Sequence, residues 1–300
     1  MWPAIKRSLL IILCLISAWS GYSQHASILW EISGKELAEP SYLMGTIHIG
    51  DSRVFEWNDS LMICLERCRV MAGELQMNDI NPQELAQAIK MPGDTTLLSL
   101  IGKKNYKMVR RYVKKRCGTM VSMVINRIKP VYTMLFISQG KEGLKPGKGE
   151  VEEREALDLY LQNMAIDRGM AVVGLETPKE QLMALEALSL QEQAELLLES
   201  IGDAGTSSAG DPMEGMIQAY LSQDLDSLYR LFVDEGLPEK LMESLIYRRN
   251  TIMFDRMRPL MRENPVFVAV GAAHLPGEKG LIQLLRDNGY TLRPVNCKVE

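Results

Sequence analysis

The sequence predicts an α/β protein, with an α+β arrangement as the alternative. Apolar, strand-like runs lie near both ends of the chain, at 27–32 and 42–47 and again at 266–270 and 290–297. The long stretch between them is dominated by the helical spacing of apolar residues. Two of the strand-like runs end in the same short motif, Gly-x-x-His. We therefore expect a mixed β-sheet core formed by the N- and C-terminal strands, with a large helical insertion over roughly residues 80–260.

The first residues predict a signal peptide at 1–23. Lys6 and Arg7 precede an almost wholly apolar run, and small residues follow it at a suitable cleavage site. This run is too short to span a bilayer comfortably, and a retained membrane anchor is the alternative. We expect residues 24–300 to be exported, periplasmic or secreted, as a single domain without a transmembrane segment.

Composition narrows the classes of partner. The chain has 300 residues, 46% of them hydrophobic and 24% charged, which is ordinary for a globular protein. A formal charge of −4 gives no electrostatic case for nucleic acid as the main partner. The substrate class, whether peptide or small molecule, and the oligomeric state are left open.

The strand-like runs and helices alternate in a definite order. The apolar runs with strand character are 27–32, 42–47, 70–75, 170–175, 266–270 and 290–297, of which 170–175 and 266–270 are expected to be buried strands. Helices are expected at 56–69, 82–91, 95–139, 150–169, 178–201, 213–263 and 278–288. Asn81 and Pro82 predict a capped helix start, and breaks are expected near Asp224, 236–238 and Pro259. Residues 202–212 have the composition of a linker.

Eight basic residues crowd the segment 103–116. Tyr106, Val109, Tyr112 and Val113 fall on the opposite side of the expected helix. A solvated face of an amphipathic helix is the favoured interpretation, and binding of an anionic lipid or substrate is the alternative.

Four cysteines remain after signal removal: Cys64, Cys68, Cys117 and Cys297. In an exported protein this even number permits disulfides, and the pairing cannot be deduced from the sequence. Cys64 and Cys68 also have a spacing that suits a metal on a helix, although no Cys/His partner set accompanies them. Structural disulfides and buried thiols are the favoured readings.

Candidate site residues come from three strand ends. His48 and His274 each follow an apolar run through Gly-x-x, beginning at Gly45 and Gly271, and histidine is the usual metal ligand and acid–base group near neutral pH. Glu74 ends another apolar run, where a carboxylate needs a partner. Together these side chains predict a site for a hydrolytic metal, or a metal-free site in which Glu74 or a histidine acts as general base. The alternative is that the histidines are structural and hydrogen-bonded.

The motifs resemble those of the TraB/GumN family, which belongs with the Tiki metalloproteases. The opening motif is Tyr42-Leu43-Met44-Gly45-Thr46-Ile47-His48, and the closing motif runs from Gly271 to Leu281. The run from Val172 to Leu182 resembles the family's central segment, and Arg249-Asn250 its helical Arg-Asn pair. The family is distantly similar to erythromycin esterases and ChaN-type haem-binding proteins.

The resemblance implies a Tiki-like fold and an exported metal-dependent hydrolase, most simply a peptidase that uses manganese or cobalt. His48, Glu74 and His274 match the metal-binding positions, and the same three residues and Arg249 match catalytic ones. Asn250, Gly45 and Gly271 match substrate-orienting or supporting positions. Asp158 and Glu176 match less specific positions: Asp158 as a helix contact and Glu176 as a helix N-terminal group. The alternative function is non-catalytic binding of haem, a metal or another small ligand in the cell envelope.

Overall fold

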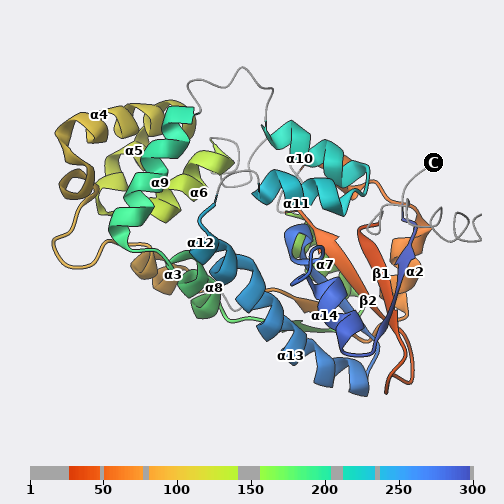
Figure 1. The fold of residues 1–300 in the computed structure, drawn as a ribbon. Helices are drawn as coiled ribbons and strands as arrows, with labels where there is room; N and C mark the ends of the chain where they lie inside the picture. Colours follow the sequence, from red (N-terminus) through yellow and green to blue (C-terminus); the bar gives the residue numbers. More distant parts are fainter. Residues whose placement is uncertain are drawn as a thin grey trace, which may run out of the picture.

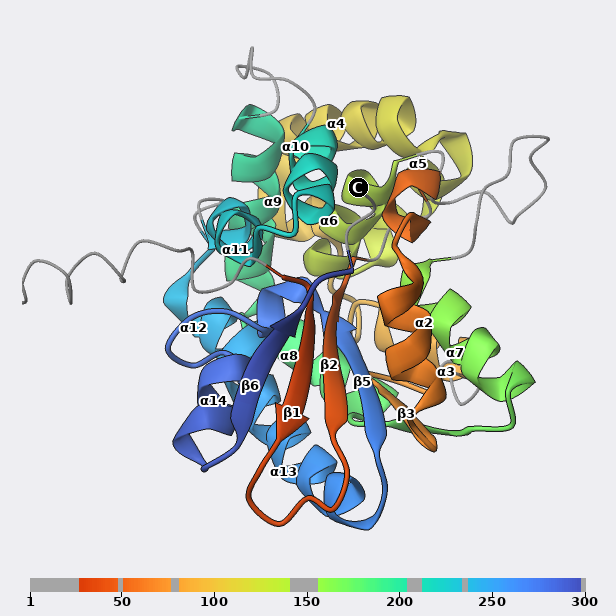
Figure 2. The ribbon, with the colours of Figure 1, turned by 90° about the vertical axis from the view of Figure 1, so that its right-hand side faces the viewer.

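A mixed β-sheet forms the centre of the described part of the chain. The computed structural model describes residues 27–47, 51–76, 81–140, 156–203, 212–233 and 237–297. Within them six strands lie in the order β4-β3-β5-β2-β1-β6. Figure 2 shows β3, β5, β2, β1 and β6 side by side. The strands are β1 (Leu29–Ser33), β2 (Ser41–Thr46), β3 (Val70–Gly73), β4 (Ala171–Gly174), β5 (Val266–Gly271) and β6 (Thr291–Val295). The predicted α/β class, with N- and C-terminal strands in one sheet, is confirmed.

Strand pairing brings distant segments to one edge of the sheet. Strands β4, β3, β5 and β2 run parallel, whereas β1 pairs antiparallel with both β2 and β6. Thr46 at the end of β2 pairs with Gly271 at the end of β5, and Gly73 at the end of β3 pairs with Gly174 at the end of β4. The carboxyl ends of four strands therefore meet at the edge where α/β folds place their ligands.

Helices account for most of the remaining described chain. The α-helices are α2 (Asp59–Glu66), α3 (Pro82–Ala88), α4 (Leu97–Cys117), α5 (Thr119–Val124), α6 (Pro130–Gln139), α7 (Leu157–Asp167), α8 (Pro178–Leu185), α9 (Leu190–Asp203), α10 (Pro212–Leu221), α11 (Leu225–Val233), α12 (Glu239–Met242), α13 (Arg248–Glu263) and α14 (Leu281–Asp287). Shorter turns are the 3₁₀ helices η1 (Ser52–Phe55), η3 (Ile125–Arg127) and η5 (Ala272–His274), and the π-helical turn η4 (Glu243–Tyr247). As predicted, Asn81 caps α3, because its side-chain oxygen accepts a hydrogen bond from the Gln83 backbone N–H.

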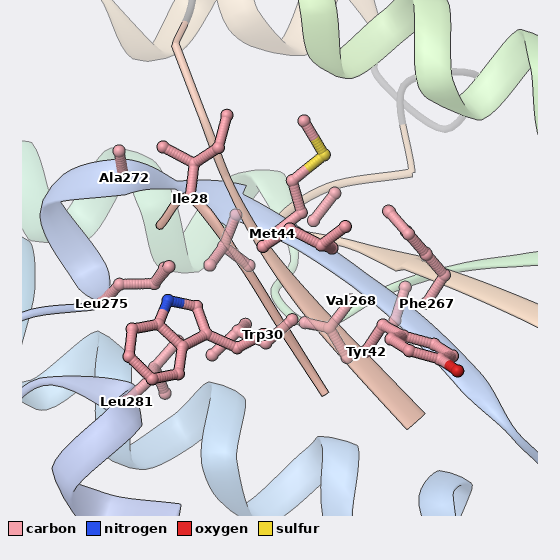
Figure 3. Close-up of a cluster of buried hydrophobic side chains, with 14 of the residues drawn as sticks. Ile28, Trp30, Tyr42, Met44, Phe267, Val268, Ala272, Leu275 and Leu281 are labelled. Carbon is pink, nitrogen blue, oxygen red and sulfur yellow. The ribbon is translucent and has the colours of Figure 1, made fainter. Parts of the chain in front are cut away.

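The main hydrophobic core fills the space between the sheet and its helices. Helix α2 lies on one side of the sheet, and α13 and α14 lie on the other (Figure 1). Figure 3 shows Trp30 of β1 beside Leu275 and Leu281, near the start of α14. The Trp30 indole N–H donates to the Ser27 carbonyl at 2.8 Å, so this large buried side chain keeps its polar atom satisfied.

Helices α4, α5, α6 and α9 form a second layer, which we call the helical cap. It has its own apolar cluster, in which Val109 and Val113 of α4 are buried together with Leu197 of α9. Figure 1 shows the helical cap displaced from the sheet, beyond α12. The segment predicted as an insertion also returns to the sheet, because α7 packs against β3 and β4.

Two local predictions were wrong. Helix α13 runs without a break through Pro259, whose ring lies on the exposed side, while Met257 and Met261 on the other side are buried. Proline removes one helical hydrogen bond there, and water can solvate the carbonyl that it frees at Asp255. Strand β4 was expected to be buried, but it is the edge strand, so Ala171 is exposed.

Cys64, Cys68, Cys117 and Cys297 are free, buried thiols. Burial raises the pKa of Cys68 to about 12 and that of Cys297 to about 11, which disfavours the reactive thiolate. The buried-thiol reading applies to all four side chains in this structure. The predicted signal peptide at 1–23 and His25 lie outside the described residues. No helix in the described part of the chain is long and apolar enough to cross a bilayer.

Candidate functional site

The candidate site lies at the carboxyl ends of β3, β4 and β5. Glu74 directly follows β3, Glu176 lies two residues beyond β4, and His274 ends the η5 turn after β5. Helix α13 supplies Arg249 and Asn250 from the other side. The structure therefore brings together four of the predicted residues, Glu74, Arg249, Asn250 and His274, and adds Glu176 to them.

His48 lies outside the described residues. The described part of its segment ends at Ile47, directly after β2, and Thr46 of β2 pairs with Gly271 of β5. The predicted pairing of His48 with His274 stays a prediction.

Glu74 is fixed through both of its carboxylate oxygens. Oε1 accepts a hydrogen bond from the Gly271 backbone N–H at 2.7 Å. Oε2 accepts one from the Arg249 guanidinium at 2.6 Å and one from the Gln181 side-chain amide at 3.0 Å. These contacts join β3, β5, α8 and α13 at one buried carboxylate, so its orientation depends on four separate segments.

Arg249 bridges two buried carboxylates. Its Nε and Nη2 atoms donate to Glu176, the latter at 2.7 Å, and Nη1 donates to the Leu245 carbonyl at 3.1 Å. Burial raises the pKa of Glu176, an effect that the Arg249 guanidinium opposes. Burial disfavours the charged guanidinium too, but Glu74 and Glu176 outweigh this effect and raise the pKa of Arg249. The pairing stabilises the charged forms of Arg249 and Glu176 against the cost of burial.

Asn250 fixes the His274 ring. The Asn250 side-chain nitrogen donates to the carbonyls of His274 and Lys279, at 3.2 and 2.8 Å, so its oxygen is the acceptor that faces the ring. The distance from that oxygen to His274 Nδ1 is 2.6 Å. Nδ1 therefore carries the proton, and in the neutral ring Nε2 keeps its lone pair.

His274 Nε2 faces Glu74 Oε1 at 3.6 Å, which is too long for a hydrogen bond. Imidazole nitrogens and carboxylate oxygens both bind divalent metals such as zinc at about 2.0–2.2 Å. Two such atoms that bind one ion therefore lie about 3.0–3.6 Å from each other. The pair thus fits two corners of a metal site. No group of three or more His, Cys, Asp or Glu side chains in the described ranges is arranged around one such position.

Among the described residues, the cluster has more acidic than basic side chains. Glu74 and Glu176 contribute two negative charges, and Arg249 contributes one positive charge. All three side chains are at most 10% exposed, and buried charge is costly without compensation. Either an imidazolium or a bound metal ion next to Glu74 would balance the cluster.

Gly45 and Gly271 support the site through the backbone. The Gly45 carbonyl accepts a hydrogen bond from the buried Tyr220 hydroxyl at 3.0 Å, and Gly271 holds Glu74 as described above. A Cβ atom on Gly45 would lie 3.1 Å from both Cα and Cβ of Ala272, the first residue of the η5 turn. The absence of a side chain at Gly45 lets β2 approach the turn that carries His274.

We expect Gly45→Ala to destabilise the fold by about 1–3 kcal/mol, because the new methyl group pushes against Cα and Cβ of Ala272. Urea unfolding measures this change. Gly215→Ala is the matched control, since its Cβ would meet nothing within 4 Å and α10 favours alanine. A Gly45→Ala variant as stable as the wild type would contradict the close approach.

The sequence does not reveal the site contacts of Gln181 and Glu176, and it indicates only a general helix contact for Asp158. Gln181 lies in the central segment from Val172 to Leu182, and no sequence pattern indicates a role for it. In the structure its side-chain amide donates to Glu74. The sequence indicates a helix N-terminal role for Glu176, whereas its side chain pairs with Arg249. The helix contact expected of Asp158 links it to β2, because the Thr46 hydroxyl donates to it at 2.5 Å. The signal for Glu176 is its position just after an apolar run, the same signal that singles out Glu74.

Comparison of the sequence with known proteins identifies relatives of this chain. The chain is 26% identical to a protein named metalloprotease TIKI2 from Danio rerio, over 88% of this chain and 60% of the relative. It is 25% identical to metalloprotease TIKI1 from Homo sapiens, over 89% of this chain and 62% of the relative. A metalloprotease TIKI homolog from Amphimedon queenslandica is also 25% identical, over 89% of this chain and 61% of the relative.

The chain spans about 60% of the length of these curated relatives. No solved structure matches it. The TraB/PrgY/gumN family profile matches residues 28–294, from the first strand to the last. The match covers both strand-end motifs and every segment that builds the site, so the chain belongs to the TraB/PrgY/gumN family.

Proposed function

We propose that this protein is a metal-dependent hydrolase of the Tiki type and that it cleaves peptide bonds. The observation that carries the proposal is the pair formed by His274 and Glu74: Nε2 of an oriented imidazole faces a buried carboxylate oxygen at 3.6 Å. The similarity to proteins named metalloproteases supports the same chemistry. Export through the signal peptide at 1–23 belongs to the proposal, as does the single domain at 24–300.

His48, Glu74 and His274 would hold the divalent ion, for which manganese or cobalt is the proposal. When bound there, the ion supplies Lewis-acid polarisation of the substrate carbonyl. Glu74 suits a ligand better than a base, since three hydrogen bonds already fix its two oxygens. A general base needs freedom to approach the water proton that it accepts.

Arg249 serves this site as a positioning residue. Its Nε, Nη1 and Nη2 atoms donate to Glu176, to the Leu245 carbonyl and to Glu74, respectively, so the guanidinium is directed at the protein. It holds the Glu74 carboxylate toward His274. Asn250 plays the corresponding part for the imidazole, since an oriented ring presents its Nε2 lone pair in one direction.

The test is the metal content of protein purified without a histidine tag, together with cleavage of a mixed peptide library. We expect one divalent ion per wild-type chain and cleavage that manganese or cobalt supports. The His48→Ala/His274→Ala variant should lose both, and His25→Ala, at the third histidine, is the matched control. Full cleavage by the double variant would overturn the proposal.

The same experiment separates the non-catalytic alternative. Metal bound through both histidines with no cleavage of any peptide would indicate a metal-binding protein. A Soret band that appears on adding haem and disappears in the double variant would indicate a haem-binding protein. Either result would replace hydrolysis by ligand binding at the same strand ends.

A further inference from the structure

The helical cap exposes a cationic surface that the candidate site does not use. Helix α4 carries eight basic residues, all exposed, which we call the basic face: Lys103, Lys104, Lys107, Arg110, Arg111, Lys114, Lys115 and Arg116. Across the described parts of the chain, none of the eight forms an ion pair. The opposite side of α4 is buried in the helical cap through Val109 and Val113. The basic face therefore points away from the protein.

Charge is strongly segregated along the sequence. Residues 95–141 contain eleven lysines and arginines and no aspartate or glutamate. The remainder of the chain has 23 basic and 38 acidic residues, so it is strongly negative. A purely solubilising surface gains nothing from such separation, because interspersed charges of both signs keep a protein soluble without a single-sign field. The segregation instead favours an anionic partner at α4.

Exposed apolar side chains accompany the cations. Met108 of α4 is 42% exposed, and Met120, Met123 and Val124 of α5 are 80%, 58% and 53% exposed. Helix α5 follows α4 after Gly118 and packs against it. A hydrogen bond at 3.3 Å from Arg110 to the Ser122 carbonyl ties the two helices together. Unpaired cations beside exposed methionines are the pattern of a protein that lies on a membrane surface.

A hollow of about 380 Å³ lies on this surface. Its cationic wall is formed by Lys104, Lys107, Arg111 and Lys115. Tyr112 of α4 and Ile201 of α9 form part of its apolar lining. Four cations above an apolar lining match the chemistry of a phospholipid, in which a phosphate headgroup joins an acyl chain.

We propose that the basic face and the exposed methionines of α5 dock onto a membrane leaflet rich in anionic phospholipid. The four cations of the hollow contact headgroup phosphates, and Met120 and Met123 enter the apolar boundary beneath the headgroups. The proposal is independent of the proposed function, because α4 and α5 lie on the helical cap, away from the strand ends (Figure 1). Docking would hold the hydrolase site close to a lipid surface.

Vesicle flotation with the full chain tests the proposal. The protein is mixed with vesicles of phosphatidylcholine, or of phosphatidylcholine and phosphatidylglycerol in equal amounts, at low and at physiological salt. We expect binding to the anionic vesicles only, weaker at higher salt. The variant Lys104→Gln/Lys107→Gln/Arg111→Gln/Lys115→Gln should bind at least on the order of 100-fold more weakly, since each basic residue near such a surface contributes about fivefold.

A matched control removes the same number of positive charges from another part of the surface. Lys90→Gln/Arg168→Gln/Lys179→Gln/Lys240→Gln changes four exposed cations outside the basic face and should bind like the wild type. Met120→Ser/Met123→Ser should weaken binding about tenfold by removing apolar insertion. Thermal unfolding checks that every variant is folded.

Four outcomes would overturn the docking. They are equal binding to neutral vesicles, equal loss in the two four-residue variants, unchanged binding of the Met120→Ser/Met123→Ser variant, and equally tight binding of DNA. Displacement by inorganic phosphate together with an unchanged methionine variant would assign the hollow to free phosphate instead. Loss confined to the basic-face and methionine variants would establish the lipid surface as the partner.

Discussion

Arg249→Leu is expected to destabilise the protein by about 3–5 kcal/mol, the largest effect of any single change at the site. The substitution leaves Glu74 and Glu176 buried without the guanidinium that both contact. Removing one partner of a buried ion pair costs this much because the remaining charge stays desolvated. Urea unfolding measures the loss of stability. The stability of Arg249→Lys should lie between those of the wild type and Arg249→Leu, since one ammonium group cannot reproduce the three directed donors of the guanidinium.

The pH dependence identifies the cause of that loss. Burial already raises the pKa of Glu176, and without Arg249 it should rise further. A carboxyl with a raised folded pKa lowers stability as the pH rises through that pKa, and imposes no penalty below its unfolded pKa of about 4.3. The deficit of Arg249→Leu should therefore be larger at pH 8 than at pH 5.

Arg262→Leu is the matched control on the same helix. Arg262 pairs with Glu36 at 3.0 Å, but both side chains are largely exposed, and such pairs contribute about 0–1 kcal/mol. If Arg249→Leu cost as little as this control, or cost the same at pH 5 and pH 8, the two glutamates would not depend on Arg249.

The sheet was largely predictable because its strands are short apolar runs. Residues 266–270 contain only Val, Phe and Ala, and β5 occupies them as a fully buried strand. The strand order was not predictable, because β5 lies between β3 and β2 in the sheet. Along the chain, β5 begins about 190 residues after the end of β3 and about 220 residues after the end of β2. Parallel pairing depends on such distant contacts and leaves no local signal. The same limit hid the edge position of β4, whose sequence resembles that of a buried strand.

The site was predictable in its motif residues and not in its ion pairs. Glu74 was identified because a carboxylate ending an apolar run needs a partner. Which partner it has could not be deduced, since Arg249 lies 175 residues further along the chain. The resemblance singled out Arg249 and Asn250 but suggested that Arg249 acts on the substrate. The structure turns its guanidinium toward Glu176 and Glu74, and only tertiary packing determines that direction.

Asn250→Leu is expected to release the His274 ring and weaken metal binding by about 10- to 100-fold, the range seen when a partner of a metal-bound histidine is lost. Asn250 is fully buried, and its oxygen accepts the Nδ1 proton while its nitrogen binds two carbonyls. Without that acceptor, nothing in this contact favours a proton on Nδ1 over Nε2. Competition with a chelator measures the affinity.

Histidine ¹⁵N NMR separates this positioning from a loss of stability. The chain has only three histidines, and His274→Gln assigns the signal of His274. Wild-type His274 should carry its proton on Nδ1, whereas Asn250→Leu should give a mixture of tautomers. Asn250→Asp provides the control, because it keeps an acceptor for Nδ1 but sets a carboxylate oxygen against the carbonyls of His274 and Lys279. The Asn250→Asp variant should lose stability but keep the proton on Nδ1. Two results would contradict the role of Asn250: a wild-type His274 ring protonated on Nε2, or a shift of the proton from Nδ1 in both variants in proportion to their loss of stability.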